Sequence, residues 1–282
     1  DWSQPASFYL LQWGPVLAAL LYEHMRKRRL SQVPVSVHGV DSISVVIPTL
    51  NEAGQLACCI ASLRRMTKPP MEILVVDGGS TDRTLSIARE HGVETYEATG
   101  GRGSQLLRGL NEVKGDVTVF VHADTTLAPD TGERIVQSLN GDPSVVGGSV
   151  GQKFDASGLS YSLVEILNDM KTALTGISFG DQVQFIRTHA AKEHGLVPNI
   201  PLMEDVELSL RMKQVGRACY LWGGATVSAR KWSGNFLARF RQVVYLLALF
   251  FARRLKGRIQ TEDLYRIYYP ETVSLQTLSS TT

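Results

Sequence analysis

Two aspartates, Asp124 and Asp205, stand where side-chain carboxylates can take part in a reaction. Asp124 follows an apolar run over residues 117–121 that predicts a buried strand, so its carboxylate would lie just beyond the strand's carboxyl end. Asp205 opens a segment with helical spacing and would lie in the first turn of a helix. Oxygen ligands suit Mg²⁺ or Mn²⁺ better than zinc, and a positioned carboxylate can act as a general base. Together they suggest metal-assisted group transfer from a phosphorylated donor.

Each candidate also has a purely structural interpretation. Acidic residues such as Glu204 and Asp205 are expected in a first helical turn because of the helix dipole alone. Asp124 could be a helix or turn cap. His122, two residues earlier, could be a nitrogen ligand of the same metal, but a histidine at a strand end is more often held by structural hydrogen bonds.

The elements that must position these residues alternate between short β-branched runs and helical stretches from residue 42 to 222. This alternation predicts an α/β fold with a mainly parallel central sheet flanked by helices. The expected strands cover 43–47, 72–76, 93–96, 117–121, 145–150, 182–186 and 218–221. The expected helices cover about 53–66, 81–91, 103–113, 130–139, 159–174 and 204–215.

Polar residues follow the first four expected strands, and ligands bind beyond the carboxyl ends of the strands in such sheets. Asp77, at the end of the second strand, could accept a hydrogen bond from a nucleobase, with Gly79 allowing close approach of the backbone. Ser80 or Asp82 could instead cap the following helix. Arg102 begins a helix after two glycines and could contact a phosphate there, or it could be solvated in a flexible loop.

Composition indicates one large domain with terminal attachments. The 282 residues are 44% hydrophobic and 20% charged, and the net charge is only +2, which argues against disorder and against a general nucleic-acid surface. The three cysteines have neither disulfide nor zinc spacing. We therefore expect a reducing, cytoplasmic location, with peripheral attachment to a membrane as an option.

Five segments occur together in an order that resembles the family 2 glycosyltransferases. They are residues 44–52 (Ser-Val-Val-Ile-Pro-Thr-Leu-Asn-Glu), 73–82, the strand that ends at Asp124, 203–211 (Met-Glu-Asp-Val-Glu-Leu-Ser-Leu-Arg) and 229–232 (Ala-Arg-Lys-Trp). The resemblance covers about residues 42–232. It implies a GT-A fold, a nucleotide-sugar donor with UDP favoured, Mg²⁺ or Mn²⁺ as cofactor, and inversion at the anomeric carbon.

The resemblance also implies roles for individual residues. Asp205 matches the catalytic base, with Glu204 beside it, and Asp124 matches the last acid of a metal-binding Asp-x-Asp triplet, with His122 in the place of its first acid. The nucleotide and donor residues implied are Pro48, Thr49, Asn51, Glu52, Asp77, Gly79, Arg102, Arg230 and Trp232, and those of the acceptor and sugar cleft are Gly148, Asp181 and Gln182.

Three departures from the family pattern bear on function. His122 lowers the negative charge expected at the metal, and Leu50 stands where many relatives place an aromatic residue that stacks on the base. Lys231 lies within the 229–232 segment, and no Gln-x-x-Arg-Trp segment of processive synthases is present. Transfer of a single sugar is therefore the better prediction.

The terminal segments raise the question of membrane contact. Residues 1–41 contain an apolar stretch, 8–22, that is too short to span a bilayer and is followed by basic residues, which favours an interfacial helix. Residues 233–269 include an apolar helix whose stripe comprises Phe240, Val244, Leu247, Phe251 and Leu255. This helix could lie on anionic lipid, or pack against the amino-terminal segment or a second copy of the chain. Residues 270–282 read as a flexible tail.

Two other functions remain open from the sequence. The acceptor could be a polyprenyl phosphate, which is already an anion and needs no base. Alternatively, the chain could bind a nucleotide sugar without catalysis, as the histidine at 122 and the leucine at 50 allow. The expected partners are a nucleotide sugar and an unidentified carbohydrate or lipid-linked acceptor, with a membrane surface and a second copy of the chain as options, and no nucleic acid.

Overall fold

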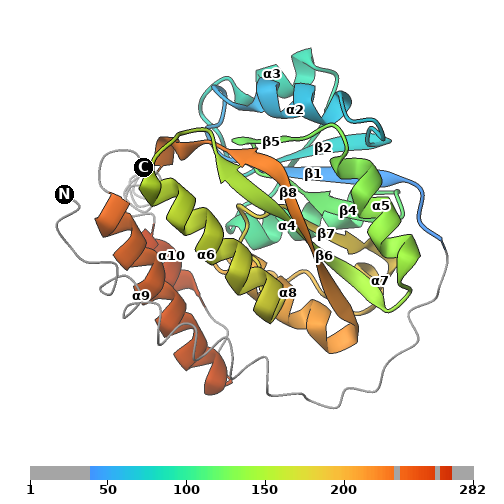
Figure 1. The fold of residues 1–282 in the computed structure, drawn as a ribbon. Helices are drawn as coiled ribbons and strands as arrows, with labels where there is room; N and C mark the ends of the chain where they lie inside the picture. The colour runs from blue at the N-terminus through green and yellow to red at the C-terminus, as the bar shows by residue number, and fades with distance from the viewer. Residues whose placement is uncertain (1–38, 232–235, 258–260, 269–282) are drawn as a thin grey trace.

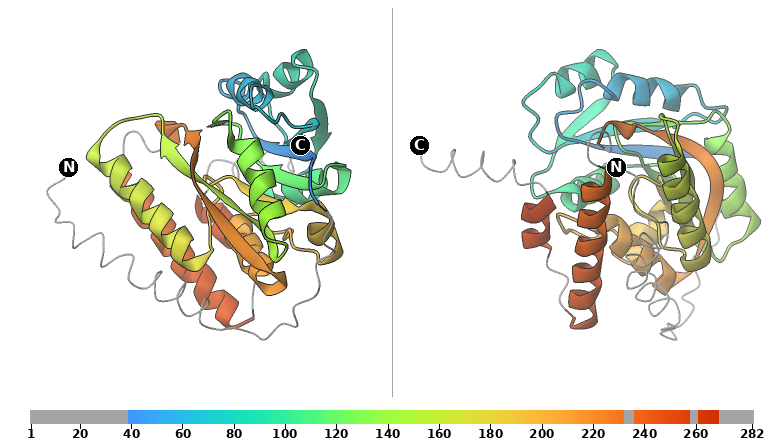
Figure 2. Two further views of the ribbon diagram at one scale, coloured as in Figure 1. Left: turned by 45° about the vertical axis from the view of Figure 1, so that its right-hand side comes forward. Right: turned by 60° about the vertical axis from the view of Figure 1, so that its left-hand side comes forward.

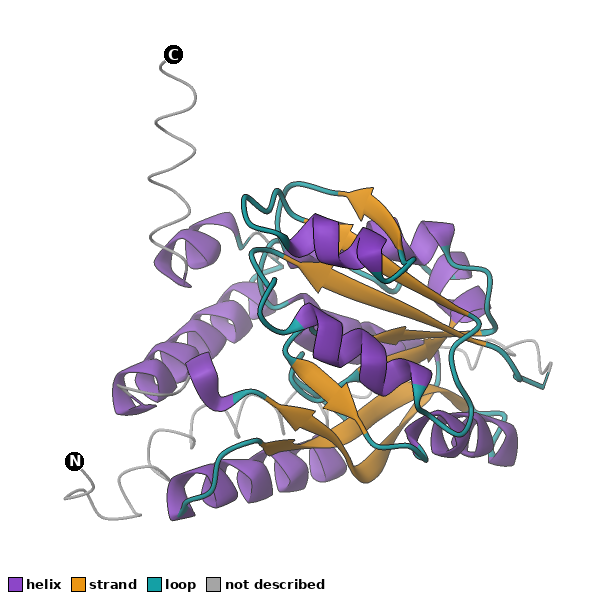
Figure 3. Ribbon diagram, turned by 90° about the horizontal axis from the view of Figure 1, so that it is seen from above, coloured by secondary structure: helices purple, strands orange, loops and turns teal. Residues whose placement is uncertain are grey.

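The computed structural model describes residues 39–231, 236–257 and 261–268 (Figure 1). The amino-terminal apolar stretch, Trp232 and the tail from residue 270 lie outside the described residues. Within the described part, one sheet of eight strands has the order β3-β2-β1-β4-β7-β6-β8-β5. Figure 3 shows helices on both sides of these strands. The α/β fold class predicted from the sequence is confirmed.

The first half of the sheet is parallel. It consists of β1 (Ile43–Thr49), β2 (Glu72–Asp77), β3 (Glu94–Glu97) and β4 (Val117–Phe120). β1 pairs in parallel with both β2 and β4, and β2 pairs in parallel with β3. The carboxyl ends of these strands therefore meet at one edge, as the sequence predicts.

The second half of the sheet is mixed. It contains β5 (Thr125–Leu127), β6 (Val145–Phe154), β7 (Gln184–Arg187) and β8 (Arg217–Val227). β7 runs antiparallel to β4 and β6, and β5 runs antiparallel to β8, while β6 and β8 are parallel. The half of the sheet in which all strands are parallel is therefore the half whose strands, β1 to β4, are followed by the polar loops.

Helices cover both faces because β1 is buried on both sides. Val45 and Ile47 belong to the core beneath α2 (Leu56–Arg64), α3 (Thr84–Glu90) and α5 (Thr131–Gly141). Val46 belongs to the opposite core, beneath α4 (Arg102–Glu112), α7 (Thr188–Glu193) and α8 (Glu204–Val215). A near-continuous apolar strand is typical of a parallel sheet covered on both faces.

Two carboxyl-terminal helices, α9 (Phe236–Leu255) and α10 (Glu262–Tyr268), complete the described chain. In Figures 1 and 2 they lie, in red, on the opposite side of the molecule from α2 and α3. Leu247 and Phe251 of α9 are buried in a cluster with Val206 and Leu210 of α8. Part of the predicted apolar stripe is thus covered by α8, whereas Leu255 is 49% exposed. No helix in the described ranges is long and apolar enough to cross a bilayer.

The helix α6 (Leu159–Thr175) buries an unusually polar face. Its buried residues are Val164, Asn168, Lys171, Thr172 and Thr175. Its exposed large hydrophobic residues are Leu159, Leu163, Ile166, Met170 and Leu174. Their spacing places these five on one face of the helix, so α6 presents an apolar stripe outward, the reverse of the usual arrangement for a helix on a globular domain.

Candidate active site

Asp77 organises the loop that follows β2. Its carboxylate is 1% exposed and accepts hydrogen bonds from the Thr49 hydroxyl at 3.0 Å, the Gly79 N–H at 2.9 Å and the N–H and hydroxyl of Ser80 at 2.7 and 2.5 Å. A carboxylate has about four acceptor positions. A nucleobase N–H would therefore have to replace one of these donors, and the Ser80 hydroxyl is the one able to rotate away.

The loops after β1 and β2 are joined through Asn51, which has a left-handed backbone with φ of 54°. Its N–H donates to the Ser80 hydroxyl at 2.8 Å, and its side-chain oxygen accepts from the Thr81 N–H at 2.9 Å. Asp82 accepts from the Thr84 N–H at 2.9 Å, where α3 begins. The capping interpretation therefore fits Asp82, while Ser80 serves the contact between loops.

Gln105 holds the ends of β1 and β2 together and was not identified from the sequence. Its side-chain amide donates to the backbone oxygens of Thr49 at 2.8 Å and Val76 at 3.0 Å. Gln105 is buried, so these bonds satisfy polar atoms away from water. A polar residue on the sheet-facing side of α4 was the signal that could have found it.

A cavity of about 190 Å³, which we call the donor cavity, opens beyond β1 and β4. It brings together six of the residues implied by the family resemblance, from three separate segments. It is lined by Pro48, Thr49, Leu50, Glu52, Gly78, Gly101, Arg102, Gln105, His122, Ala123, Asp124 and Tyr265. Tyr265 comes from α10, which the sequence did not connect with the site.

Arg230, which follows β8 in the chain, contacts a residue that lines the donor cavity. Its guanidinium lies 2.8 Å from the carboxylate of Glu52, which is 12% exposed. The predicted grouping of these two residues is therefore present in the structure. Its companion in the motif, Trp232, lies outside the described residues.

Asp124 and His122 lie beside each other at the end of β4. Asp124 is buried, at 8% exposure, and the His122 ring nitrogen Nδ1 lies 3.8 Å from a carboxylate oxygen of Asp181. No cluster of three or more histidine, cysteine or acidic side chains suited to a metal occurs in the described ranges. Mg²⁺ is usually held by one or two protein carboxylates plus substrate phosphates. The donor set at Asp124 and His122 fits that mode, in which the nucleotide completes the coordination.

Asp205 begins α8 and is fixed by backbone donors. Its two carboxylate oxygens accept from the Gly180 N–H at 2.5 Å and from the Val206 N–H at 2.7 Å. The preceding Met203 has a left-handed backbone with φ of 63°. Backbone strain of this kind is often found at functional sites, and here it turns the chain into the helix so that the Asp205 carboxylate meets Gly180.

Gly180 lies directly between the metal candidate and the base candidate. A Cβ atom at this position would lie 2.8 Å from the His122 ring and 3.3 Å from the Asp205 carboxylate. Any side chain would therefore push the two groups apart. Asp205 and His122, the residue two positions before Asp124, thus lie on either side of one glycine at the edge of the sheet.

Glu204 contacts Arg102 and does not line the donor cavity. The Arg102 Nε lies 2.6 Å from Glu204 Oε1, and the glutamate is 1% exposed. Burial is the main cause that raises the pKa of Glu204 to about 7; Arg102 acts to lower this pKa and Asp205 acts to raise it. Arg102 was expected to contact a phosphate. It is held by Glu204, and it lines the donor cavity and also a second cavity, which lies beside Asp205.

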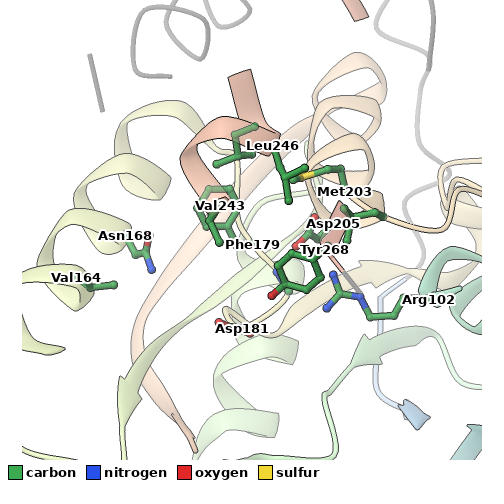
Figure 4. Close-up of a pocket in the computed structure, with 13 residues that line it drawn as sticks. Arg102, Val164, Asn168, Phe179, Asp181, Met203, Asp205, Val243, Leu246 and Tyr268 are labelled. Atoms are coloured by element: carbon green, nitrogen blue, oxygen red, sulfur yellow. The ribbon is translucent and has the colours of Figure 1, made fainter. Parts of the chain in front are cut away.

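The second cavity, of about 110 Å³, lies beside Asp205, and we call it the acceptor cavity (Figure 4). Its walls come from α6, α9, α10 and the segments before α8. The lining residues are Arg102, Val164, Asn168, Phe179, Gly180, Asp181, Leu202, Met203, Asp205, Val243, Leu246, Leu247 and Tyr268. Most of these residues were not identified from the sequence, because they come from elements far apart in the chain.

Gly148 and Gln182, expected at the acceptor cleft, line neither cavity. Gly148 lies inside the sheet, where a Cβ atom would be only 2.1 Å from the Cys219 backbone oxygen. Its glycine is required by the close approach of β6 and β8, and this expectation is corrected. Gln182 is fully buried and accepts from the Thr172 hydroxyl at 2.7 Å. Asp181 does line the cavity.

Lys171 is a buried cation behind the acceptor cavity. Its ammonium lies 3.1 Å from the centre of the Phe179 ring and 3.4 Å from the side-chain oxygen of Gln182. Burial lowers the pKa of Lys171 to about 7, although Asp205, Asp181 and Asp169 act to raise it. The sequence places this lysine on an ordinary amphipathic helix and gives no sign that it faces inward.

We predict that Lys171→Met stabilises the protein at neutral and lower pH. The folded-state pKa is depressed, so the charged lysine costs stability below pH 7, and this cost disappears as the pH rises towards 10.5. At about 1.4 kcal/mol per pKa unit, the gain is of the order of a few kcal/mol at pH 6. Urea unfolding at pH 6 and pH 9 measures it, with the exposed Lys114→Met as control. A variant less stable than the parent at pH 6 contradicts this prediction.

Comparison with known proteins places these features in context. The model of "Glycosyl transferase family 2" matches residues 44–191. An undecaprenyl-phosphate 4-deoxy-4-formamido-L-arabinose transferase of Serratia proteamaculans is 30% identical over 165 residues, which are 54% of this chain and 50% of that protein. A PGL/p-HBAD biosynthesis glycosyltransferase of Mycobacterium bovis is 36% identical over 91 residues, 30% of this chain and 36% of that protein. The chain thus spans half or less of the length of these relatives.

Two solved structures resemble the fold. The mannosyltransferase PcManGT from Pyrobaculum calidifontis, in complex with GDP-Man and Mn²⁺, has a TM-score of 0.59 at 18% identity, covering 93% of this chain and 80% of that one. TarS of S. aureus, residues 1–349 with UDP-GlcNAc, has a TM-score of 0.54 at 18% identity, covering 82% and 73%. The predicted GT-A fold is confirmed.

Proposed function

The chain belongs to glycosyl transferase family 2 and is a glycosyltransferase, and we propose that it moves one sugar from a nucleotide diphosphate to an acceptor hydroxyl with inversion. One observation carries this proposal. Gly180 holds the Asp205 carboxylate beside His122, and Arg102 lines both adjoining cavities. A donor in one cavity and an acceptor in the other would therefore meet at Asp205.

Asp205 is proposed to accept the proton of the acceptor hydroxyl. The resulting oxygen nucleophile forms a bond to the anomeric carbon, and the bond from that carbon to the diphosphate oxygen breaks, so the electron pair leaves with the nucleoside diphosphate. The Gly180 and Val206 N–H groups orient the carboxylate.

Asp124 and His122 are proposed to hold Mg²⁺ or Mn²⁺. When bound, such an ion neutralises charge on the diphosphate. The carboxylate of Asp124 lines the donor cavity together with Thr49 and Arg102, so all three would face the nucleotide. Similar folds bind Mn²⁺ with GDP-Man or UDP-sugars, which supports a divalent ion for this chain.

UDP is the favoured nucleotide in this proposal. Asp77 would accept a hydrogen bond from the uracil N–H once the Ser80 hydroxyl turns away, and TarS has been solved with UDP and with UDP-GlcNAc. Leu50 lines the cavity where a base would lie, so the base would contact an aliphatic side chain.

Transfer to a polyprenyl phosphate is a second candidate. It is favoured by the undecaprenyl-phosphate transferases among the relatives. A phosphate acceptor is already an anion, so transfer to it would not need a base. Activity that depends on a polyprenyl phosphate and survives replacement of Asp205 would favour this function over transfer to a hydroxyl.

We expect UDP with Mn²⁺ to raise the melting temperature. A ligand at one hundred times its Kd stabilises the folded state by about 2.7 kcal/mol, which corresponds to about 5–10 °C for a chain of this size. A thermal-shift screen of UDP, GDP, ADP and dTDP, each with and without Mn²⁺, measures this effect. If none of the nucleotides shifts the transition, the assignment of the donor cavity is wrong.

A further inference from the structure

The acceptor cavity is apolar along most of its wall. Val243, Leu246 and Leu247 line it from one face of α9, and Val164 lines it from α6. Such side chains offer no hydrogen bonds to sugar hydroxyl groups. A purely carbohydrate acceptor would therefore leave its hydroxyls unsatisfied along this wall, which disfavours its binding.

The charged groups of the cavity lie towards the proposed reaction centre, while Asn168 is a polar residue of the opposite wall. Figure 4 shows Arg102 near Asp205, Asp181 between these two and Val164, and Val164 with Asn168 at the side away from Arg102. The Asp205 carboxylate is held there by Gly180. A ligand that fits this distribution has a polar end at Asp205 and an apolar portion directed towards α6 and α9.

The outer face of α6 offers a continuation for that apolar portion. The cavity, at about 110 Å³, is too small to enclose a whole amphiphile. The helix that supplies Val164 also carries the exposed stripe of Leu163, Ile166 and Met170, at 37%, 55% and 52% exposure. Apolar surface of this kind, next to a binding site, marks an interaction surface rather than ordinary solvent contact.

We propose that the acceptor is an amphiphile, with the reacting oxygen at Asp205 and an aliphatic chain that passes between α6 and α9. This inference rests on the proposed function, since it identifies the acceptor class of the same transferase site. The chain contacts Val164 and Val243 inside the cavity and leaves along the apolar stripe of α6. The unusual orientation of α6 is then explained, because its outward apolar face is the one that contacts the aliphatic chain.

The test compares ligands that differ only in chain length. Binding of methyl and octyl β-D-glucoside to the full chain is measured by calorimetry with UDP and Mn²⁺ present. Each fully buried methylene strengthens binding by up to about fourfold, so the octyl compound is expected to bind at least about tenfold more tightly. Methyl and octyl phosphate form a second pair, which shows whether the polar end is a sugar or a phosphate; a chain-length effect in either pair supports the proposal.

A matched pair of variants locates the effect. Val243→Asn places a polar group in the cavity wall, whereas Val244→Asn makes the same change on the same helix outside the cavity; both residues are partly buried. Val243→Asn is expected to lower octyl affinity about tenfold more than it lowers methyl affinity. Val164→Asn gives the same test from α6 if Val243→Asn fails to fold.

Two results would overturn the proposal. One is equal affinity for methyl and octyl compounds in both pairs, and the other is an equal effect of Val243→Asn and Val244→Asn on octyl binding. In either case a thermal shift by UDP would still support the donor cavity. Loss of that nucleotide shift in the parent chain would instead count against the proposed function itself, so the two failures are distinguishable.

Discussion

Asp205→Asn is expected to lower the rate of sugar transfer by about 10² to 10⁴, the usual contribution of a general base. The amide keeps the size of the side chain, and its oxygen can still accept from the Gly180 or Val206 N–H. It cannot take a proton from the acceptor hydroxyl. The contact between the Gly180 backbone and the start of α8 is therefore preserved while the proposed chemistry is removed.

The measurement separates turnover from donor binding. Steady-state transfer is followed with the donor identified by the thermal-shift screen, and UDP affinity is measured by calorimetry. UDP affinity is expected to remain within about twofold of the parent, since Asp205 does not line the donor cavity. Asp130→Asn, at an exposed position that follows β5 in the chain, is the control. Near-normal transfer by Asp205→Asn would remove this residue from the mechanism.

Asp124→Ala is expected to abolish the dependence of UDP binding on Mn²⁺. Even changes to groups that only orient a metal ligand cost about 10- to 100-fold in metal affinity, so loss of the ligand itself should cost at least as much. His122 alone is a single neutral ligand and does not replace the carboxylate. UDP is therefore expected to bind the variant with one affinity, whether or not Mn²⁺ is present.

Calorimetry with UDP, with and without Mn²⁺, measures this prediction in the parent, in Asp124→Ala and in the control Asp130→Ala. Asp124 is buried, so circular dichroism and the melting temperature without ligand must first show a folded variant. If UDP binds the parent equally well in both conditions, a metal at Asp124 is not part of donor binding.

Most of the fold could be predicted because local patterns and tertiary packing agree. The helix expected over 204–215 has those bounds in the structure, and β1 and β2 were expected from their β-branched runs. β5 was missed because three residues carry no usable periodicity, and it is held by pairing with β8. α7 was missed because its six residues directly follow β7.

The candidate site was predictable where its residues end strands. Asp77, His122 and Asp124 were placed at one edge because parallel strands carry their carboxyl ends there. Gln105 and Lys171 could not be assigned in this way, because their roles depend on which face of a helix is buried. Lys171 in particular lies on a helix whose polar side faces inward, contrary to the rule used to orient helices.

The donor cavity is lined mostly by residues from the first half of the chain, whereas about half of the residues that line the acceptor cavity come from its last third. The family model ends at residue 191, and it includes most of the donor cavity. The acceptor cavity takes Leu202, Met203, Asp205 and its α9 and α10 walls from beyond that point. Under the proposed assignment of the two cavities, evolution would change what is glycosylated by altering the last third of the sequence, while the inherited nucleotide site remains undisturbed. Descendants of one ancestral gene could in this way share a donor and diverge in acceptor.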